Sequence, residues 1–271
     1  MGYPRPAGLI SVPATLILVG IILAARAASH PQTPNKTTRI RILSYNIRHG
    51  EGMDTVIDLD RTAKVIRALR PDIVALQEVD SAVERTGRVH QAEVLGRLTG
   101  MQHVFGGFFD YQGGRYGMAL LSRFPIASFE NHRLPDGLEP RTALAARIVP
   151  AGSTDTLIVV GIHLYATAEE RQAQASRIVD IFRGNHLPVL LAGDFNSTPE
   201  SDVMALFRTW ENPDKGDDHL TFPSREPERE IDYVLYRPAD RFQIVEIDVI
   251  DEPLASDHRP VLVELGLSGR G

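Results

Sequence analysis

Short apolar segments recur along the chain from about residue 38 onward, with polar stretches between them. Many are rich in Val, Ile and Leu, as strands require, and several are continuous rather than alternating, which is typical of strands buried on both faces. We therefore predict strands at residues 39–45, 72–79, 117–122, 142–149, 156–164, 188–195, 231–236, 242–250 and 259–265.

Three segments between the apolar runs have the period of an amphipathic helix. Residues 58–70 have Asp58 or Asp60 as the N-cap, and residues 91–100 end at Gly100. Residues 167–183 begin with Thr167 and Glu170, which have the spacing of a capping box. Each half of the chain contains a helix, a short loop and a strand that ends in polar residues. This repeated order of elements predicts two packed sheets with helices outside them.

Polar residues follow the apolar part of several predicted strands. Asp194 and Asn196 end the run 188–195, and residues two apart on a strand face the same side, so we expect both to project together. Other strands begin or end with comparable residues, namely Asn46, Glu78, His163, Asp232, Asp257 and His258. A single strand-end Asp or Asn is usually a turn former. That explanation does not account for polar residues at the ends of so many strands. Together these carboxylates, imidazoles and amides favour a site that binds a hard divalent cation and carries acid–base groups.

Seven motifs strengthen this interpretation when they are taken in order. They are "SYNIRHG", "DIVALQEVD", "YGMALLSRFPI", "GIHLYA", "LLAGDFNS", "EIDYVLY" and "ASDHRPVLVEL". Together they resemble the motifs of the endonuclease/exonuclease/phosphatase superfamily, the deoxyribonuclease I-like hydrolases, over residues of about 38–267. The resemblance implies an α/β fold, a four-layer α/β/β/α sandwich of two packed mixed sheets. It also implies Mg²⁺- or Mn²⁺-dependent cleavage of phosphate esters.

The resemblance assigns the metal side of the site to three positions. Glu78 matches the family's metal ligand, and carboxylates are what Mg²⁺ prefers. Asn46 matches the amide beside it, which contacts metal or phosphate. Asp257 corresponds to a residue that binds a second metal or the attacking water.

Five further positions match the catalytic residues of the family. Asp194 matches the residue that orients and deprotonates the attacking water, and Asn196 matches the amide that fixes that water or a phosphate oxygen. His258 matches the imidazole on the scissile phosphate, and Asp232 resembles the carboxylate that orients it, a pairing that favours the imidazolium. His163 matches a second histidine near the leaving group.

Other polar residues give weaker signals. Arg141 is either a ligand of a phosphate oxygen or a solvated loop residue, and Tyr116 either lines the pocket or belongs to the core. We expect the remaining histidines to be structural; they are His49, His90, His103, His132, His186 and His219.

Composition and charge narrow the range of substrates. The chain has 271 residues, 43% of them hydrophobic, and no cysteine, which excludes disulfides and thiolate chemistry. Without the first 28 residues, which contain two arginines and no acid, the net charge falls from −6 to −8. Tight phosphate-backbone binding needs many cations. We therefore expect a small or lipid-linked phosphodiester, keep a secreted nuclease of DNA or RNA as the alternative, and keep a non-catalytic binding module as the other class.

The N-terminus predicts export. Residues 7–25 contain no charge, Arg5 precedes them, and "ARA" at 25–27 resembles a cleavage site for a signal peptide. An uncleaved membrane anchor is the rival interpretation for residues 1–28, although Pro13 shortens the uninterrupted helix. We expect a linker at 29–38, a hydrolase domain at 39–267, a periplasmic or extracellular location, and a monomer.

Overall fold

The computed structural model describes residues 1–4, 37–153 and 155–269. The predicted export segment therefore lies outside the described residues except for its first four, and so does the predicted linker except for Thr37 and Thr38, which begin the first strand. The chain divides into the units Met1–Pro34 and Asn35–Gly271, and the description below concerns the second. Within the described part of the chain, no helix combines the length and the apolar character needed to cross a membrane.

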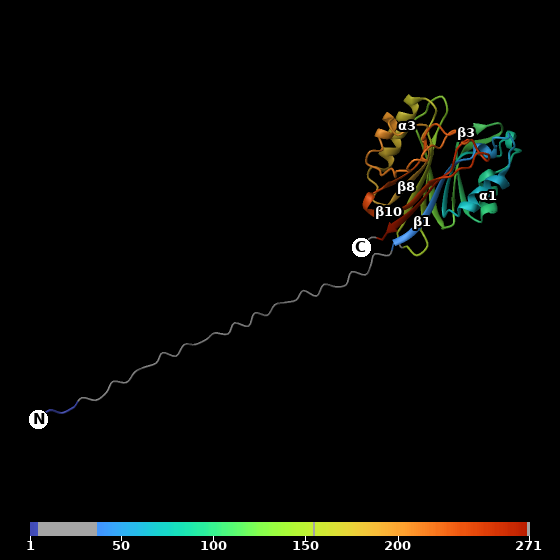
Figure 1. Ribbon diagram of the computed structural model, residues 1–271. Helices are drawn as coiled ribbons and strands as arrows, with labels where there is room; N and C mark the ends of the chain where they lie inside the picture. The colour runs from blue at the N-terminus through green and yellow to red at the C-terminus, as the bar shows by residue number, and fades with distance from the viewer. Residues whose placement is uncertain (5–36, 154, 270–271) are drawn as a thin grey trace. The chain divides into compact units, whose positions relative to one another are not determined.

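The strands of the larger unit form two mixed sheets (Figure 1). The six-stranded sheet has the order β10-β11-β1-β2-β4-β3, with β1 at Thr37–Asn46, β2 at Ile73–Ser81, β3 at Gln102–Tyr111, β4 at Gly114–Ser122, β10 at Phe242–Val249 and β11 at Val261–Ser268. The five-stranded sheet has the order β5-β6-β7-β8-β9, with β5 at Ile126–Arg133, β6 at Thr142–Ile148, β7 at Leu157–His163, β8 at Val189–Asp194 and β9 at Asp232–Arg237.

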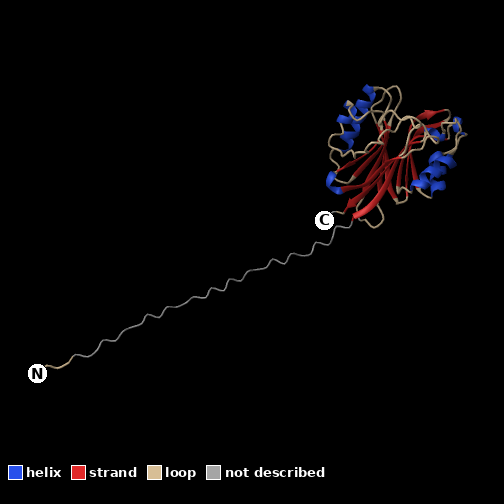
Figure 2. Cartoon of the chain, viewed as in Figure 1, coloured by secondary structure: helices blue, strands red, loops and turns tan. Residues whose placement is uncertain are grey.

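Helices cover the outer faces of both sheets (Figure 2). They are α1 at Leu59–Leu69, α2 at Gln91–Thr99, α3 at Ala168–Phe182 and α4 at Asp202–Ala205, with short 3-10 turns η1 at Arg48–Gly50, η2 at Glu84–Thr86 and η3 at Ala239–Arg241. Three clusters of buried hydrophobic residues fill the spaces between the four layers. One lies between the sheets around Ile42, Leu120 and Val159, one joins α1 and α2 to the first sheet, and one joins α3 and α4 to the second. The predicted α/β/β/α sandwich is confirmed.

Each sheet contains one parallel pair joined by a helix. β1 pairs with β2 in parallel through α1, and β7 pairs with β8 in parallel through α3. The carboxyl ends of parallel strands meet at the same edge of a sheet, and this edge is where α/β proteins bind ligands. The sequence places Asn46 and Glu78 at this edge of the first sheet and His163 and Asp194 at this edge of the second.

Some local predictions are wrong. β3 and β5 are absent from the predicted strands, and the capping box of the third helix does not form. Thr167 occupies the N-cap position of α3 without a side-chain cap bond, and the Glu170 carboxylate accepts a hydrogen bond from the Leu138 N–H, at 3.1 Å, rather than from Thr167. At α1 the cap is Asp58, whose carboxylate accepts a hydrogen bond from the Arg61 N–H.

Candidate active site

The carboxylate of Asp194 lies at the centre of the polar cluster between the two sheets. Its side chain is almost fully buried, and its Oδ2 atom faces two groups from β1 and β7 and one from the loop before β11. The Nδ2 atom of Asn46 lies 3.3 Å away, Nε2 of His163 lies 3.4 Å away and Nε2 of His258 lies 3.7 Å away. One carboxylate oxygen therefore meets an amide and two imidazoles, an arrangement suited to holding and moving a proton.

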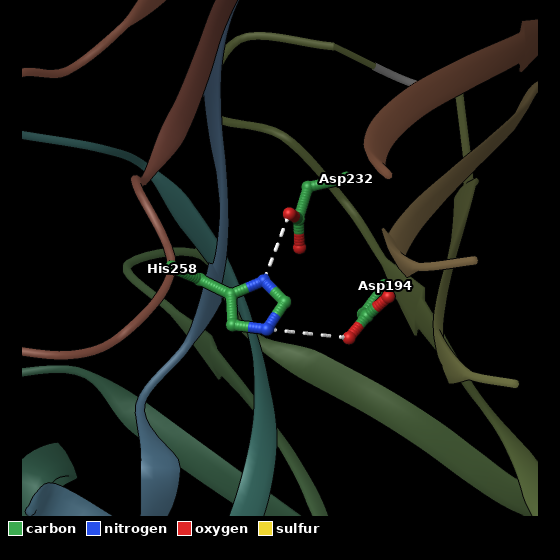
Figure 3. A group of neighbouring side chains, drawn as sticks. All are labelled: Asp194, Asp232 and His258. Atoms are coloured by element: carbon green, nitrogen blue, oxygen red, sulfur yellow. Dashed lines mark hydrogen bonds and ion pairs between the residues drawn. The ribbon is translucent and has the colours of Figure 1, made fainter. Parts of the chain in front are cut away.

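His258 and Asp232 form a hydrogen-bonded pair beside Asp194 (Figure 3). Nδ1 of His258 lies 2.9 Å from Oδ2 of Asp232, while Nε2 points to Asp194. The antiparallel register of β8 and β9 sets Asp232 opposite Asp194. The ring of Phe222 packs against the imidazole at 4.7 Å. The carboxylate fixes the ring orientation, so Nε2 is the atom presented to the centre of the site.

The protonation of this group follows from its burial and its charges. Burial raises the pKa of Asp194 to about 7; the charge of Asp232 adds to the rise and that of His258 opposes it. Burial alone would lower the pKa of His258, but the carboxylates of Asp232 and Asp194 outweigh it and raise this pKa to about 10. Near neutral pH, His258 is therefore a cation and Asp194 titrates, which suits an acid–base pair.

Glu78 reaches the site because β2 is irregular in its second half. The register with β4 shifts between Leu76 and Val79, and Glu78 has a φ of 58°, in the left-handed region. This conformation costs a non-glycine residue about 1–3 kcal/mol and is typical of functional positions. It turns the carboxylate toward Asn46, whose Nδ2 donates to Oε1 at 3.0 Å.

The residues around Glu78 fit a hard divalent cation. Burial raises the pKa of Glu78, and the negative charge of Asp257 raises it further against the opposing hydrogen bond from Asn46. Two carboxylates that repel each other are a suitable oxygen set for such an ion. Asn46 donates to carboxylates through Nδ2, and its Oδ1 accepts from the Arg48 N–H at 3.1 Å, so Glu78 and Asp257 are the oxygen donors that this arrangement offers.

A second group also has the spacing of a metal site. Ligand atoms of Asp194, Asp232 and His258 all lie within 4.8 Å of one another. The imidazole already contacts both carboxylates, however, and its charge compensates theirs (Figure 3). Arg48 Nε lies 3.8 Å from Asp257, but Glu78 is bound by the neutral amide of Asn46. The pair of Glu78 and Asp257 therefore keeps more uncompensated negative charge and is the better cation site, and the trio is better suited to proton transfer.

Asn196 does not lie where strand alternation would place it. β8 ends at Asp194, and Asn196 has a φ of 48°, so the chain turns before the second residue can share the face of the first. Its N–H donates to Oδ1 of Asp194 at 2.7 Å, and its Nδ2 donates to the carbonyl of Leu164 at 3.0 Å. The expectation from strand geometry is wrong, and the tight turn is what keeps Asn196 next to Asp194.

His163 and Arg141 line the site from β7 and from the start of β6. Burial lowers the pKa of His163 well below its usual value, and the charges of Arg141 and His258 add to this effect. Its Nδ1 is buried without a hydrogen bond. Arg141 is only 4% exposed, so it is not a solvated loop residue. Its Nη2 donates to Glu139 at 3.0 Å, whereas Nε and Nη1 are buried without hydrogen-bond partners and the guanidinium lies 4.8 Å from the ring centroid of Phe108. Two buried donors without acceptors are suited to binding an anion.

Several supporting residues were not recognised in the sequence. The hydroxyl of Ser256 donates to the carbonyl of Asn46 at 2.6 Å and so ties the loop before His258 to the end of β1. Arg85 binds Asp80 through two hydrogen bonds next to the site. The signal available in the sequence was the arginine of "RTG" at 85–87, because a buried acid such as Asp80 requires a positively charged partner. Three histidines that we expected to be structural pair with neighbours of their own: His49 with Glu51, His90 with Ser81 and His132 with Glu130.

Comparison with known proteins agrees with this description. The Endonuclease/Exonuclease/phosphatase family model matches residues 43–258. The chain is 29% identical over 254 residues to YbhP, an uncharacterised protein of Escherichia coli K12, covering 86% of this chain and 100% of that protein. A family structure from Beutenbergia cavernae has a TM-score of 0.69 at 24% identity, over 85% of this chain and 72% of that one.

Two further solved structures share the fold at lower identity. A mannosyl-6-phosphatase of Bacteroides thetaiotaomicron has a TM-score of 0.68 at 18% identity, over 83% of this chain and 99% of that one. The catalytic domain of human Nocturnin has a TM-score of 0.65 at 22% identity, over 85% of this chain and 95% of that one.

Proposed function

The chain belongs to the endonuclease/exonuclease/phosphatase family of hydrolases, and from this premise we propose that it is an exported, divalent-metal-dependent phosphodiesterase. The observation that supports this proposal is the position of Asp194. A base with a pKa of about 7 lies beside a cationic histidine that is anchored by its own carboxylate. A non-catalytic binding module would have no need of this costly burial of charge.

Each residue of the site has a separate role in the proposed reaction. Asp194 takes the proton from the attacking water, and Asn196 helps to fix the orientation of that carboxylate through its N–H. The imidazolium of His258 stabilises the negative charge that develops on the phosphate, and Asp232 keeps it oriented and protonated. The free nitrogens of Arg141 bind a phosphate oxygen.

Glu78 and Asp257 would hold the divalent cation, Mg²⁺ or Mn²⁺. When bound, the cation neutralises phosphate charge and polarises the phosphoryl oxygens.

A diester substrate is favoured by His163. Its lowered pKa makes the imidazole neutral near pH 7, so it serves as a hydrogen-bond donor to the leaving oxygen rather than as a store of positive charge. A diester carries one negative charge less than a monoester dianion, so a neutral rather than a cationic imidazole beside the phosphate suits the diester. A mannosyl-6-phosphatase shares this fold, and its name indicates a monoester substrate. Monoesters must therefore be assayed beside diesters.

A small or lipid-linked diester is favoured over DNA or RNA by charge. Residues 29–271 have a formal charge of −8, which repels a polyanion. The export segment supports an extracytoplasmic substrate. Fractionation of expressing cells tests this part: a cytoplasmic protein that retains Met1 contradicts export, whereas an intact N-terminus in the membrane fraction supports an anchor.

One panel tests the proposal. Bis(p-nitrophenyl) phosphate, p-nitrophenyl phosphate, plasmid DNA, RNA, sphingomyelin, inositol phosphates and glycerophosphodiesters are assayed with Mg²⁺, with Mn²⁺ and with EDTA. We expect metal-dependent cleavage of small or lipid diesters above that of monoesters and polymers. Faster cleavage of the monoester contradicts the diester assignment, and plasmid nicking faster than every small diester supports the nuclease instead.

A further inference from the structure

An aromatic pocket lies next to the phosphate site on the first sheet. Arg85, Phe109, Tyr111, Tyr116 and Glu139 line a cavity of about 190 Å³. Sites that bury whole drug-sized ligands measure roughly 300–1,000 Å³. This cavity therefore has room for one small ring or a short chain.

The pocket is held rigid by a fixed arginine. Nε and Nη2 of Arg85 donate to the two oxygens of the fully buried Asp80, at 2.8 and 2.9 Å. The N–H of Arg85 donates to Oε1 of Gln112 at 3.0 Å. The guanidinium lies 5.0 Å from the ring centroid of Tyr111 and 5.4 Å from that of Tyr116. Among the described residues, no hydrogen bond engages its remaining nitrogen, Nη1.

Two residues connect this pocket to the phosphate-binding arginine. The guanidinium of Arg141 lies 5.9 Å from the ring centroid of Tyr116, and the sheet registers place Tyr116 opposite both Asp80 and Phe109. The carboxylate of Glu139, a wall of the pocket, accepts the hydrogen bond from Arg141. A group esterified to the phosphate held by Arg141 therefore has the pocket as its neighbour.

The chemistry of the walls selects the ligand. Arg85 is paired with Asp80 and Arg141 with Glu139, so the formal charges of these four side chains cancel. A second anion or a quaternary ammonium group finds no net opposite charge, and Arg85 already lies over two of the rings. The remaining features are two phenol hydroxyls, a free guanidinium nitrogen, a carboxylate and the exposed part of the Phe109 ring. Hydroxyl groups on a compact carbon skeleton satisfy all of them.

We propose that this pocket is a subsite for a neutral polyhydroxylated group, a sugar or a cyclitol, esterified to the phosphate that the enzyme cleaves. The inference rests on the proposed phosphodiesterase function and specifies its substrate. A pocket built to hydrogen-bond hydroxyls discriminates against analogues that lack them, because its polar groups are otherwise left unpaired.

The test compares two diesters that differ only in one group and adds a third that carries a sugar. Glycerophosphoinositol and glycerophosphocholine share the glycerol half, and the methyl diester of a hexose 6-phosphate separates a sugar from a cyclitol. We expect the full-length enzyme with Mg²⁺ to have a kcat/KM about tenfold or more higher for at least one polyol diester than for glycerophosphocholine. Equal values of kcat/KM, or a preference for the choline diester, overturn the proposal.

Tyr111→Phe removes one pocket hydroxyl and keeps the ring. We expect it to lower the ratio of kcat/KM for the preferred polyol diester to that for glycerophosphocholine by about two- to tenfold, the effect of one hydrogen bond. Tyr236→Phe, at the far end of β9 from Asp232, is the matched control and should leave the ratio unchanged. An unchanged ratio in Tyr111→Phe overturns the subsite even if hydrolysis is efficient. Absence of metal-dependent cleavage of every diester, bis(p-nitrophenyl) phosphate included, instead removes the proposed function, and this inference with it.

Discussion

The β1–α1–β2 unit of the first sheet and the β7–α3–β8 unit of the second have the same parallel topology, and both end at the site. The first unit delivers an amide and a carboxylate, Asn46 and Glu78, and the second delivers an imidazole and a carboxylate, His163 and Asp194. Their two carboxylates differ in their partners. Glu78 faces the negative charge of Asp257, whereas Asp194 faces the positive charge of His258. The proposed function therefore assigns different chemistry to two units of equal topology, cation binding to the first and proton transfer to the second.

Metal removal should have the largest effect, because it disables the first unit entirely. We expect EDTA to lower hydrolysis of bis(p-nitrophenyl) phosphate by about 10³-fold or more, since an ion contributes several kcal/mol of charge stabilisation. Mg²⁺ or Mn²⁺ should restore the rate. Glu78→Gln should raise the Mg²⁺ concentration needed for half-maximal activity, and Glu93→Gln, exposed on α2, is the matched control. Full activity in chelator would contradict the assignment.

Asp194→Asn should have the next largest effect, because it removes the base of the second unit and keeps its shape. We expect kcat to fall about 10²–10⁴-fold with little change in KM. Asp180→Asn, exposed on α3, provides the comparison. If Asp194→Asn kept more than about a tenth of the wild-type kcat, Asp194 would belong with Glu78 as a structural or metal-binding residue.

Asp232→Asn should act through pKa values. The charge of Asp232 raises the pKa of both Asp194 and His258, so its removal lowers both and moves the whole pH–rate profile to lower pH. The wild-type enzyme needs Asp194 deprotonated and His258 protonated, which predicts a rise in activity through about pH 7 and a fall through about pH 10. If the pKa of His258 returned to its ordinary value, only about 3% would be protonated at pH 8. We therefore expect a loss of about ten- to thirtyfold at pH 8 but no loss at pH 6, where the lower pKa of Asp194 leaves more of this base deprotonated. A uniform loss at every pH would contradict this role.

The sequence predicts the centre of each sheet better than its edges. Strands such as β7 and β8 are buried along their whole length, so their apolar runs are continuous. The two strands that were missed, β3 and β5, are both edge strands. Most residues of β5 are exposed or half-buried, and β3 contains the pair Gly106–Gly107. Their pairing is decided by the neighbouring strand, a tertiary effect that no local pattern records.

The residue types of the candidate site follow from the motifs, but their arrangement does not. Strand alternation misplaces Asn196, because a left-handed residue begins the turn immediately after β8. Glu78 depends on a bulge, which breaks the same alternation in β2. The Asp80–Arg85 pair joins a strand to a 3-10 turn, and only the folded chain shows that Arg85 faces Tyr111 and Tyr116.

The smallest expected difference between the two units lies in their helix caps. The Asp58 carboxylate caps α1 by accepting from the Arg61 N–H at 2.9 Å, whereas Thr167 makes no such bond at α3. Both positions have non-helical backbone angles, so the helix propensity of alanine does not enter. We expect Asp58→Ala to lower the free energy of unfolding by about 1 kcal/mol and Thr167→Ala by only a few tenths, measured from urea midpoints. Asp58→Asn keeps an acceptor and should recover most of the loss. Equal losses at the two positions would show that Thr167 does cap α3, and the two units would then be alike in this respect.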